Sequence, residues 1–205
     1  MQRVCYHCHI TGTSGDEAQF LRFVTAPDGT LTPDLAGKLP DGGAPLYVLA
    51  RRRVVAQLQA GQAGVDLADL TFSLMRRQAL SLLSLARKAG RLVLGFAKVE
   101  AALTRGEVAL LLAARDGAAN GKQAMAGKAK AMGVAICVVF DRQELGMALG
   151  RANVIHAGLT DAVWAARMNE QALRLIAYDE LDDGEPAADE MQVSAAQAAD
   201  RSDGL

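Results

Sequence analysis

The strongest constraint on the fold is a regular alternation of helix-like and strand-like segments over residues 69–178. Helical spacing of apolar residues predicts helices over 69–90, 95–106, 120–132, 141–150 and from Thr160 or Asp161 to Tyr178. Short apolar runs separate them, at 92–94, 108–113, 134–140 and 153–157. Continuous apolar runs of this length are typical of strands covered on both faces. Strands that alternate with helices predict an α/β/α three-layer sandwich over 69–178.

Residues 1–60 follow a different pattern, rich in turn formers. Segments 20–24 and 30–33 read as strands joined across Pro27-Asp28-Gly29, and 46–49 reads as a third strand. A short basic helix is expected over 51–59, ending near Gly61. We therefore predict a small α+β domain over 1–60, followed by a linker over 61–68.

The net charge of −1 hides a strong segregation of charge along the chain. Residues 1–178 carry 21 basic and 14 acidic residues, a net of +7, whereas residues 179–205 carry one basic and nine acidic residues, a net of −8. The tail has no aromatic residue, so we predict that 179–205 is disordered. A basic body followed by an acidic tail points first to nucleic acid as a partner.

Several classes of protein are disfavoured. The longest apolar runs are far shorter than the ~20 residues of a membrane span, and the N-terminus does not resemble a signal peptide. We therefore expect a cytoplasmic protein that does not bind membranes, with three cysteines free of structural disulfides. Because no dinucleotide-binding or P-loop motif and no triad spacing is present, we expect neither a cofactor nor an enzymatic activity.

One short cluster, Cys5-Tyr6-His7-Cys8-His9, has the residue types of a zinc site. A structural zinc site normally takes a second ligand pair from a distant turn, and no second C-x-x-C is present. Ordinary buried thiols are therefore the favoured interpretation, with Cys5 and Cys8 as weak metal candidates. A metalloprotein or enzyme built on this cluster stays open as an alternative. Cys137, within an apolar run, is expected in the core.

Basic residues carry the stronger functional signal. Residues 76–130 hold eleven basic and three acidic residues. Lys98 falls in the first turn of the helix that Gly95 opens, and Asn120, Gly121 and Lys122 repeat this pattern at the next helix. Unpaired backbone N–H groups at such positions favour anions, and lysine adds charge. The candidate RNA-binding residues are Arg22, Lys38, Arg51, Arg52, Arg53, Arg91, Gly95, Lys98, Asn120, Gly121, Lys122 and Arg151.

The N-terminal motifs resemble the YlxR-like family of small bacterial RNA-binding proteins. The matching pieces, in order over about 50 residues, are Arg3-Val4-Cys5, Phe20–Val24, Pro27-Asp28-Gly29, Asp34–Pro40 and Tyr47-Val48. The family usually continues with Gly-Arg-Gly, where this chain has Asp41-Gly42-Gly43. The resemblance implies RNA binding by this domain, with 51–53 in place of the missing arginine.

Residues 75–160 resemble a bacterial branch of the kink-turn-binding large-subunit ribosomal protein superfamily. The matching pieces are Leu85–Gly90, Gly95–Gly106 and Glu144–Gly150. The superfamily reads RNA with Gly-x-Asn-Glu-x-x-Lys, and here Ala97, Lys98 and Ala101 replace its Asn, Glu and Lys. The resemblance implies the α/β/α fold and an RNA-facing edge, without the side chains that read sheared G·A pairs.

Together these features predict a non-catalytic, two-domain RNA-binding protein, with a monomer favoured. Its partner is expected to be structured RNA in a ribosome, translation or RNA-processing setting. Two alternatives stay open: a protein-interaction scaffold whose basic edge only aids solubility, and a transcription-associated nucleic-acid-binding regulator.

Overall fold

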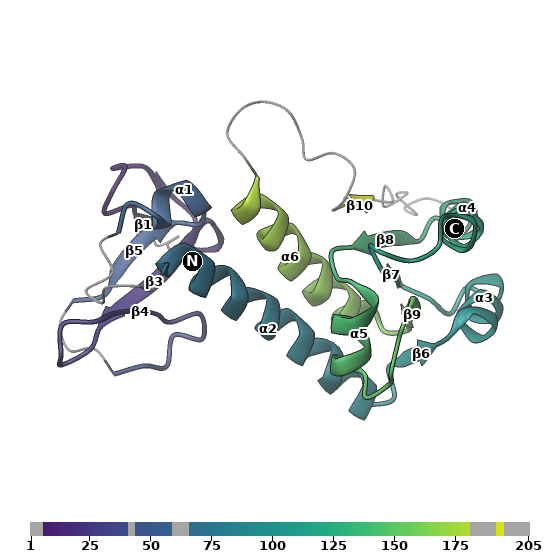
Figure 1. Cartoon of the computed structure of the whole chain (residues 1–205). Coiled ribbons are helices and arrows are strands. Elements are labelled where there is room, and N and C mark those ends of the chain that lie inside the picture. Colours follow the sequence, from purple (N-terminus) through teal and green to yellow (C-terminus); the bar gives the residue numbers. More distant parts are fainter. Residues whose placement is uncertain (1–5, 41–43, 59–65, 181–191, 195–205) are drawn as a thin grey trace, which may run out of the picture. The chain divides into compact units, whose positions relative to one another are not determined.

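The computed structural model describes residues 6–40, 44–58, 66–180 and 192–194 (Figure 1). The chain divides into two compact units. We call residues 1–78 with 174–184 the N-terminal unit, and residues 79–173 with 185–205 the sheet unit. Among the described residues, no helix combines the length and the apolar character that a bilayer span requires. The sequence-based boundaries at residues 60, 68 and 178 stay predictions.

The N-terminal unit is built on a three-stranded antiparallel sheet in the order β4-β3-β5. Its strands are β3 (Phe20–Thr25), β4 (Leu31–Pro33) and β5 (Leu46–Leu49), which confirms the three strands expected from the sequence. The turn between β3 and β4 closes as expected, because Asp28 accepts a hydrogen bond from the Thr30 N–H at 2.9 Å. A two-stranded ribbon of β1 (Tyr6–His7) and β2 (Ser14–Gly15) and a 3-10 turn, η1 (Glu17–Gln19), precede the sheet.

Helical segments complete this unit. The expected helix over 51–59 is a single turn, α1 (Arg52–Val55), with Val54 and Val55 buried. The long helix α2 (Leu67–Lys88) begins before Asp69, because Asp66 accepts hydrogen bonds from the N–H groups of Ala68 and Asp69 and so caps it. Residues 67–78 of α2 and the last turns of α6 (Ala162–Asp179) belong to this unit.

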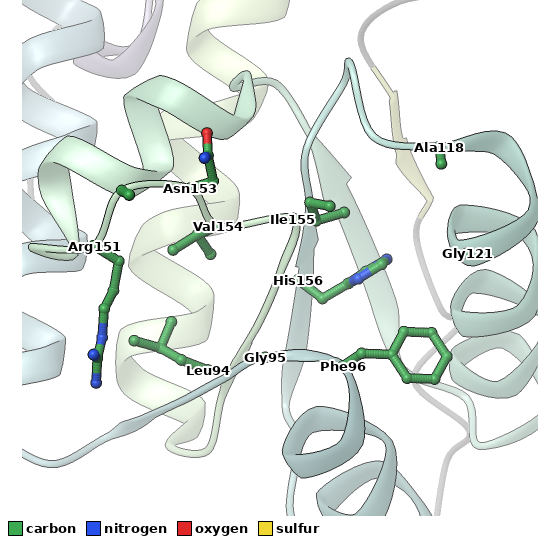
Figure 2. Close-up of a pocket in the computed structure, with 11 residues that line it drawn as sticks. Leu94, Gly95, Phe96, Ala118, Gly121, Arg151, Asn153, Val154, Ile155 and His156 are labelled. Carbon is green, nitrogen blue, oxygen red and sulfur yellow. The ribbon is translucent and has the colours of Figure 1, made fainter.

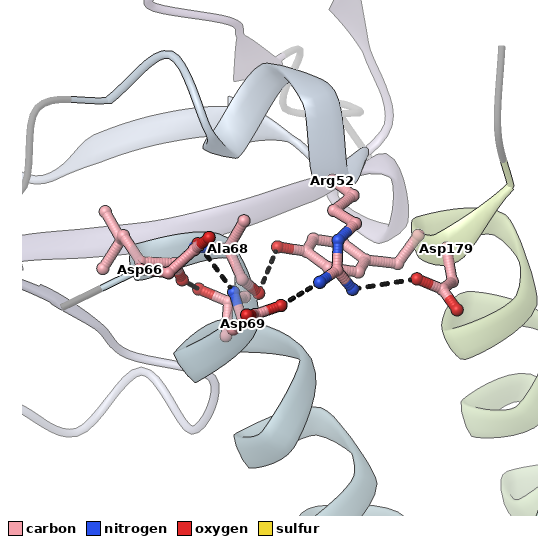
Figure 3. A network of polar contacts seen from close by, with 8 residues as sticks. Arg52, Asp66, Ala68, Asp69 and Asp179 are labelled. Carbon is pink, nitrogen blue, oxygen red and sulfur yellow. Dashed lines mark hydrogen bonds and ion pairs between the residues drawn. The ribbon is translucent and has the colours of Figure 1, made fainter.

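A network around Arg52 ties these segments together within the N-terminal unit (Figure 3). The Arg52 guanidinium pairs with Asp69 at the start of α2 and lies 2.9 Å from the Asp179 carboxylate at the end of α6. The same guanidinium lies 5.7 Å from the ring centre of Phe72, which stacks on Tyr178. The Tyr178 hydroxyl donates a hydrogen bond to the Ala68 carbonyl at 3.0 Å.

The sheet unit contains a mixed five-stranded sheet in the order β10-β8-β7-β9-β6. Its strands are β6 (Leu92–Leu94), β7 (Leu110–Ala113), β8 (Ala135–Val138), β9 (His156–Leu159) and β10 (Gln192–Ser194). Only β7 and β8 are parallel, and every other neighbouring pair is antiparallel. Helices α3 (Phe96–Thr104), α4 (Ala119–Ala131) and α5 (Arg142–Ala148) connect the strands.

Helices α3 and α4 pack on each other and on the sheet, around a core that includes Val99, Leu103, Leu111 and Met125 (Figure 1). This mixed α/β arrangement agrees with the alternation in the sequence, while the three-layer order stays a prediction. Cys137 is buried in β8 as expected, and burial raises the pKa of its thiol to about 12. The predicted capping box is confirmed, because Asp141 accepts from the Glu144 N–H while Glu144 accepts from the Asp141 N–H.

Two expectations differ from the structure. The last core strand was expected over 153–157, whereas β9 begins at His156 and ends at Leu159. Gly158 weakens the strand pattern in sequence, but a β-carbon there would lie 3.1 Å from side-chain atoms of both Val93 and Val108, so glycine permits the close packing. The expected disordered tail, 179–205, lies mostly outside the described residues, yet 192–194 forms β10 against β8.

Candidate nucleic-acid interface

A pocket of about 650 Å³ lies in the sheet unit where three segments meet (Figure 2). These are the start of α3, the start of α4 and the segment 151–155 that leads into β9. Its lining residues are Leu94, Gly95, Phe96, Ala118, Gly121, Arg151, Ala152, Asn153, Val154, Ile155 and His156. The pocket therefore joins Gly95, Gly121 and Arg151, which the sequence analysis placed in three separate segments.

The two helices that begin at this pocket lack side-chain caps. Gly95 and Ala118 occupy the N-cap positions of α3 and α4, and neither provides a side-chain acceptor. By contrast, aspartates cap α2, α5 and α6. The first N–H groups of a helix have no partner inside it, so both starts present donors and a partial positive charge. An anion is the ligand that such ends favour.

Gly95 fixes the entry into α3. Its φ of 90° lies in a region that residues with a β-carbon rarely adopt, and its N–H donates to the His156 carbonyl at 3.1 Å. This hydrogen bond connects the start of α3 to the start of β9. Position 95 therefore requires glycine because of its backbone conformation. This conformation and the hydrogen bond place the start of α3 beside the pocket.

His156 is the most unusual group of the pocket. Its side chain is buried, with 4% of the residue exposed, and its Nε2 has no hydrogen-bond partner among the described residues. The Phe96 ring lies 5.6 Å from the imidazole, centre to centre, at an angle of 79°. Burial lowers the pKa of His156. A buried polar atom without a partner requires an explanation, since it costs stability.

The lowered pKa of His156 predicts acid sensitivity of the folded chain. In the unfolded chain a histidine titrates near ~6.5, so below that pH the unfolded state binds more protons than the folded state. The unfolding free energy should therefore fall as the pH drops from about 6.5 towards the lower folded-state pKa. We expect His156→Gln to lose less stability than the unmodified chain over this window, measured by urea unfolding. Equal losses of stability in the two proteins would show that His156 is not the group responsible for the acid sensitivity.

Exposed cations stand near the helix starts. Lys98 lies exposed in the first turn of α3, and Arg151 lines the pocket. Neither forms an ion pair with a residue that the structure describes. Asn120 is exposed in the first turn of α4. Arg91 is largely exposed, and its guanidinium lies 3.9 Å from the Asp161 carboxylate. Arg91 does not line the pocket.

Lys122 differs from its sequence-based interpretation as a charge presented at the start of α4. Its Nζ donates a hydrogen bond to the Arg115 carbonyl at 2.6 Å, and the residue is half-buried. The side chain thus fastens the loop before α4. This contact joins residues seven apart through a loop conformation that residue spacing does not reveal.

The remaining candidates belong to the N-terminal unit, and most hold that unit together. Arg22 pairs with buried Asp34, whose carboxylate also accepts the backbone N–H groups of Lys38 and Leu39. Arg51 donates to the Ala177 carbonyl at 3.0 Å, and Arg52 forms the network described above. The side chains of Lys38 and Arg53 are exposed.

The weak metal candidates receive little support from the described residues. Cys5 lies outside them, and they contain no group of three or more His, Cys, Asp or Glu suited to a metal ion. Cys8 is buried, and its sulfur accepts the N–H groups of Thr11 and Leu49 at 3.4 and 3.3 Å. Burial alone would raise the pKa of this thiol, but the hydrogen bonds outweigh it and lower the pKa.

Sequence reasoning missed Phe96, Asn153, Ile155 and His156 as pocket residues. The position of Phe96 directly after Gly95, at the expected helix start, was visible in the sequence, but its exposure is known only from the structure. His156 gave no signal, because its neighbours come from α3 and α4, far away in the chain.

The region that holds the pocket is similar to a known protein family. Residues 77–169 match the model of the ribosomal protein L7Ae/L30e/S12e/Gadd45 family, and this stretch contains every pocket residue. The match supports RNA binding at a general level. No curated protein matches the chain.

Two solved structures resemble the chain over about half of its length. A protein of unknown function from Bacillus halodurans C is 30% identical, with a TM-score of 0.45, over 48% of this chain and 96% of that one. A Giardia lamblia 15.5kD RNA binding protein is 20% identical, with a TM-score of 0.39, over 51% of this chain and 84% of that one.

Proposed function

We infer that the chain is a non-catalytic protein that binds structured RNA through one edge of its sheet unit. This pocket edge consists of the pocket, the starts of α3 and α4, and the side chains of Lys98 and Arg151. The observation that carries this proposal is the convergence of two uncapped helix starts on one pocket with cations at its rim. The match of residues 77–169 to an L7Ae-type family gives independent support.

The chemistry of the edge suits a nucleotide chain. Phosphate groups are bound by backbone N–H groups at the starts of α3 and α4, with Lys98 and Arg151 adding charge. The apolar side chains of Leu94, Phe96 and Ile155 line the pocket and accommodate an unstacked base. Because only a few polar side chains face the pocket, phosphate and shape recognition dominate over reading of base edges.

The N-terminal unit contributes a second RNA-contacting surface in this proposal. Its support is the sequence resemblance to the YlxR-like family together with the exposure of Lys38 and Arg53. Arg22, Arg51 and Arg52 serve mainly to stabilise that unit. The setting we propose is translation, the ribosome or RNA processing.

A salt titration tests the proposal against a protein-interaction scaffold. The logarithm of RNA affinity should fall linearly with the logarithm of salt concentration, by roughly 0.7–0.9 per phosphate contacted. We expect a slope of about −2 to −4, corresponding to about three to five contacts at the pocket edge. The measurement is fluorescence anisotropy with a labelled structured RNA. Absence of binding at low salt would rule out the function, and a salt-independent affinity would rule out phosphate recognition.

A further inference from the structure

The positive group that the sequence analysis assigned to the start of α4 is turned towards a loop carbonyl. Lys122 donates its Nζ to the Arg115 carbonyl, and Ala118 provides no cap. Gly121, in the first turn, lies against the His156 ring: a β-carbon on Gly121 would stand 3.9 Å from its Cε1. Among the described residues, His156 is therefore an ionisable group from another element that packs against this helix start.

The charges around His156 favour an anion. Lys98 is on α3, Arg115 and Lys122 flank the start of α4, and Arg151 is on the segment before β9. Two acids lie on these segments, and each is paired: Asp116 with Arg142 at 3.1 Å, and Glu100 of α3 with Lys128 of α4 at 2.8 Å. On β7, the residue opposite His156 is the uncharged Ala113. Without an anion, these cations and the two helix ends oppose a further positive charge.

We propose that His156 takes up a proton from solvent as a phosphate of the RNA binds at the start of α4, so that RNA binding is coupled to protonation. This inference rests on the proposed function. The Phe96 ring packs edge-on against the imidazole in the free protein, and in this proposal its exposed side chain turns aside so that a phosphate reaches Nε2. Protonation makes both ring nitrogens donors, and a phosphate oxygen accepts a charge-assisted hydrogen bond. The proton returns to solvent when the RNA leaves.

The sign of the coupling follows from linkage. The bound phosphate raises the pKa of His156 above its value in the free protein, where burial lowers it. The complex therefore binds more protons than the separate partners between the two pKa values. RNA affinity must rise as the pH falls through this window, by at most about tenfold per pH unit for one proton.

The test measures RNA affinity at about pH 6 and about pH 8, on either side of the ordinary histidine pKa. The unmodified chain should bind about three- to tenfold more tightly at the lower pH. His156→Asn should show no such gain, while the matched control His9→Asn, which alters an exposed histidine of the N-terminal unit, should keep it. Any pH effect that arises from ionisable groups of the RNA itself is the same for all three proteins and cancels in the comparison. Equal pH dependence in His156→Asn and His9→Asn would overturn the inference.

Two further measurements complete the test. Calorimetry of the unmodified chain in buffers of different ionisation enthalpy should give net proton uptake per RNA bound, and zero uptake would overturn the inference without any variant. His156→Gln replaces His156→Asn if the latter does not fold. Competition by inorganic phosphate distinguishes a free-phosphate site from an RNA site. At an RNA site, phosphate should displace the RNA only when it is in large excess over the RNA. No RNA binding at either pH would instead overturn the proposed function.

Discussion

The double substitution Lys98→Glu with Arg151→Glu is expected to weaken RNA binding by more than about tenfold at moderate salt. Both side chains are exposed, Arg151 in the pocket lining and Lys98 in the first turn of α3, and each change turns an attraction for phosphate into a repulsion. The slope of log affinity against log salt should become shallower by roughly 1.5, the value for two lost contacts. Thermal stability should hardly change, because exposed charges contribute little to folding.

A matched control distinguishes the effect of the position of these charges from the effect of the net charge of the chain. Lys130→Glu with Arg167→Glu alters the net charge by the same amount at two other exposed positions of the sheet unit, neither of which lines the pocket. This variant should lose much less RNA affinity than the pocket-edge variant. If both variants lose the same affinity, the chain attracts RNA by its overall charge and the pocket edge is not the interface.

Features that depend on neighbouring residues were predictable from the sequence. The Asp141–Glu144 capping box and the Pro27-Asp28-Gly29 turn each involve side chains and N–H groups within a few residues. The start of α3 after Gly95 is equally local, because the glycine backbone itself defines it. The same logic failed at α2: the helix was expected to begin at Asp69, but Asp66, three residues earlier, caps it.

Features that depend on distant segments were not predictable. Arg52 pairs with Asp69 and Asp179, which are 17 and 127 residues away, so three adjacent arginines in the sequence do not form a simple basic patch. Lys122 turns inward to a loop carbonyl in a similar way. The environment of His156 requires α3, α4 and the segment before β9 to meet, and no local pattern encodes that meeting.

The segment that carries Arg151 packs closely against a second glycine, Gly146 in α5. A β-carbon at this position would lie 2.8 Å from the Arg151 carbonyl oxygen and 3.0 Å from that of Ala152. These are backbone atoms, so no side-chain rotation relieves the overlap. The Arg151 N–H donates to the Gly146 carbonyl at 2.9 Å, which holds the segment close to the helix. Any β-carbon at position 146 must therefore displace the segment that carries Arg151.

We expect Gly146→Ala to lower the unfolding free energy by about 1–3 kcal/mol, the usual cost of overpacking a well-packed site. RNA affinity should fall as well, since Arg151 and the segment 151–155 move with the displaced backbone. The matched control is Gly127→Ala in α4, where a β-carbon would meet nothing within 4 Å. That change should instead stabilise the chain by about 0.5–1 kcal/mol, because alanine favours helix. Urea unfolding of the two variants measures both effects, and a loss of stability no larger in Gly146→Ala than in Gly127→Ala would show that the contact between α5 and the Arg151 segment is not tight.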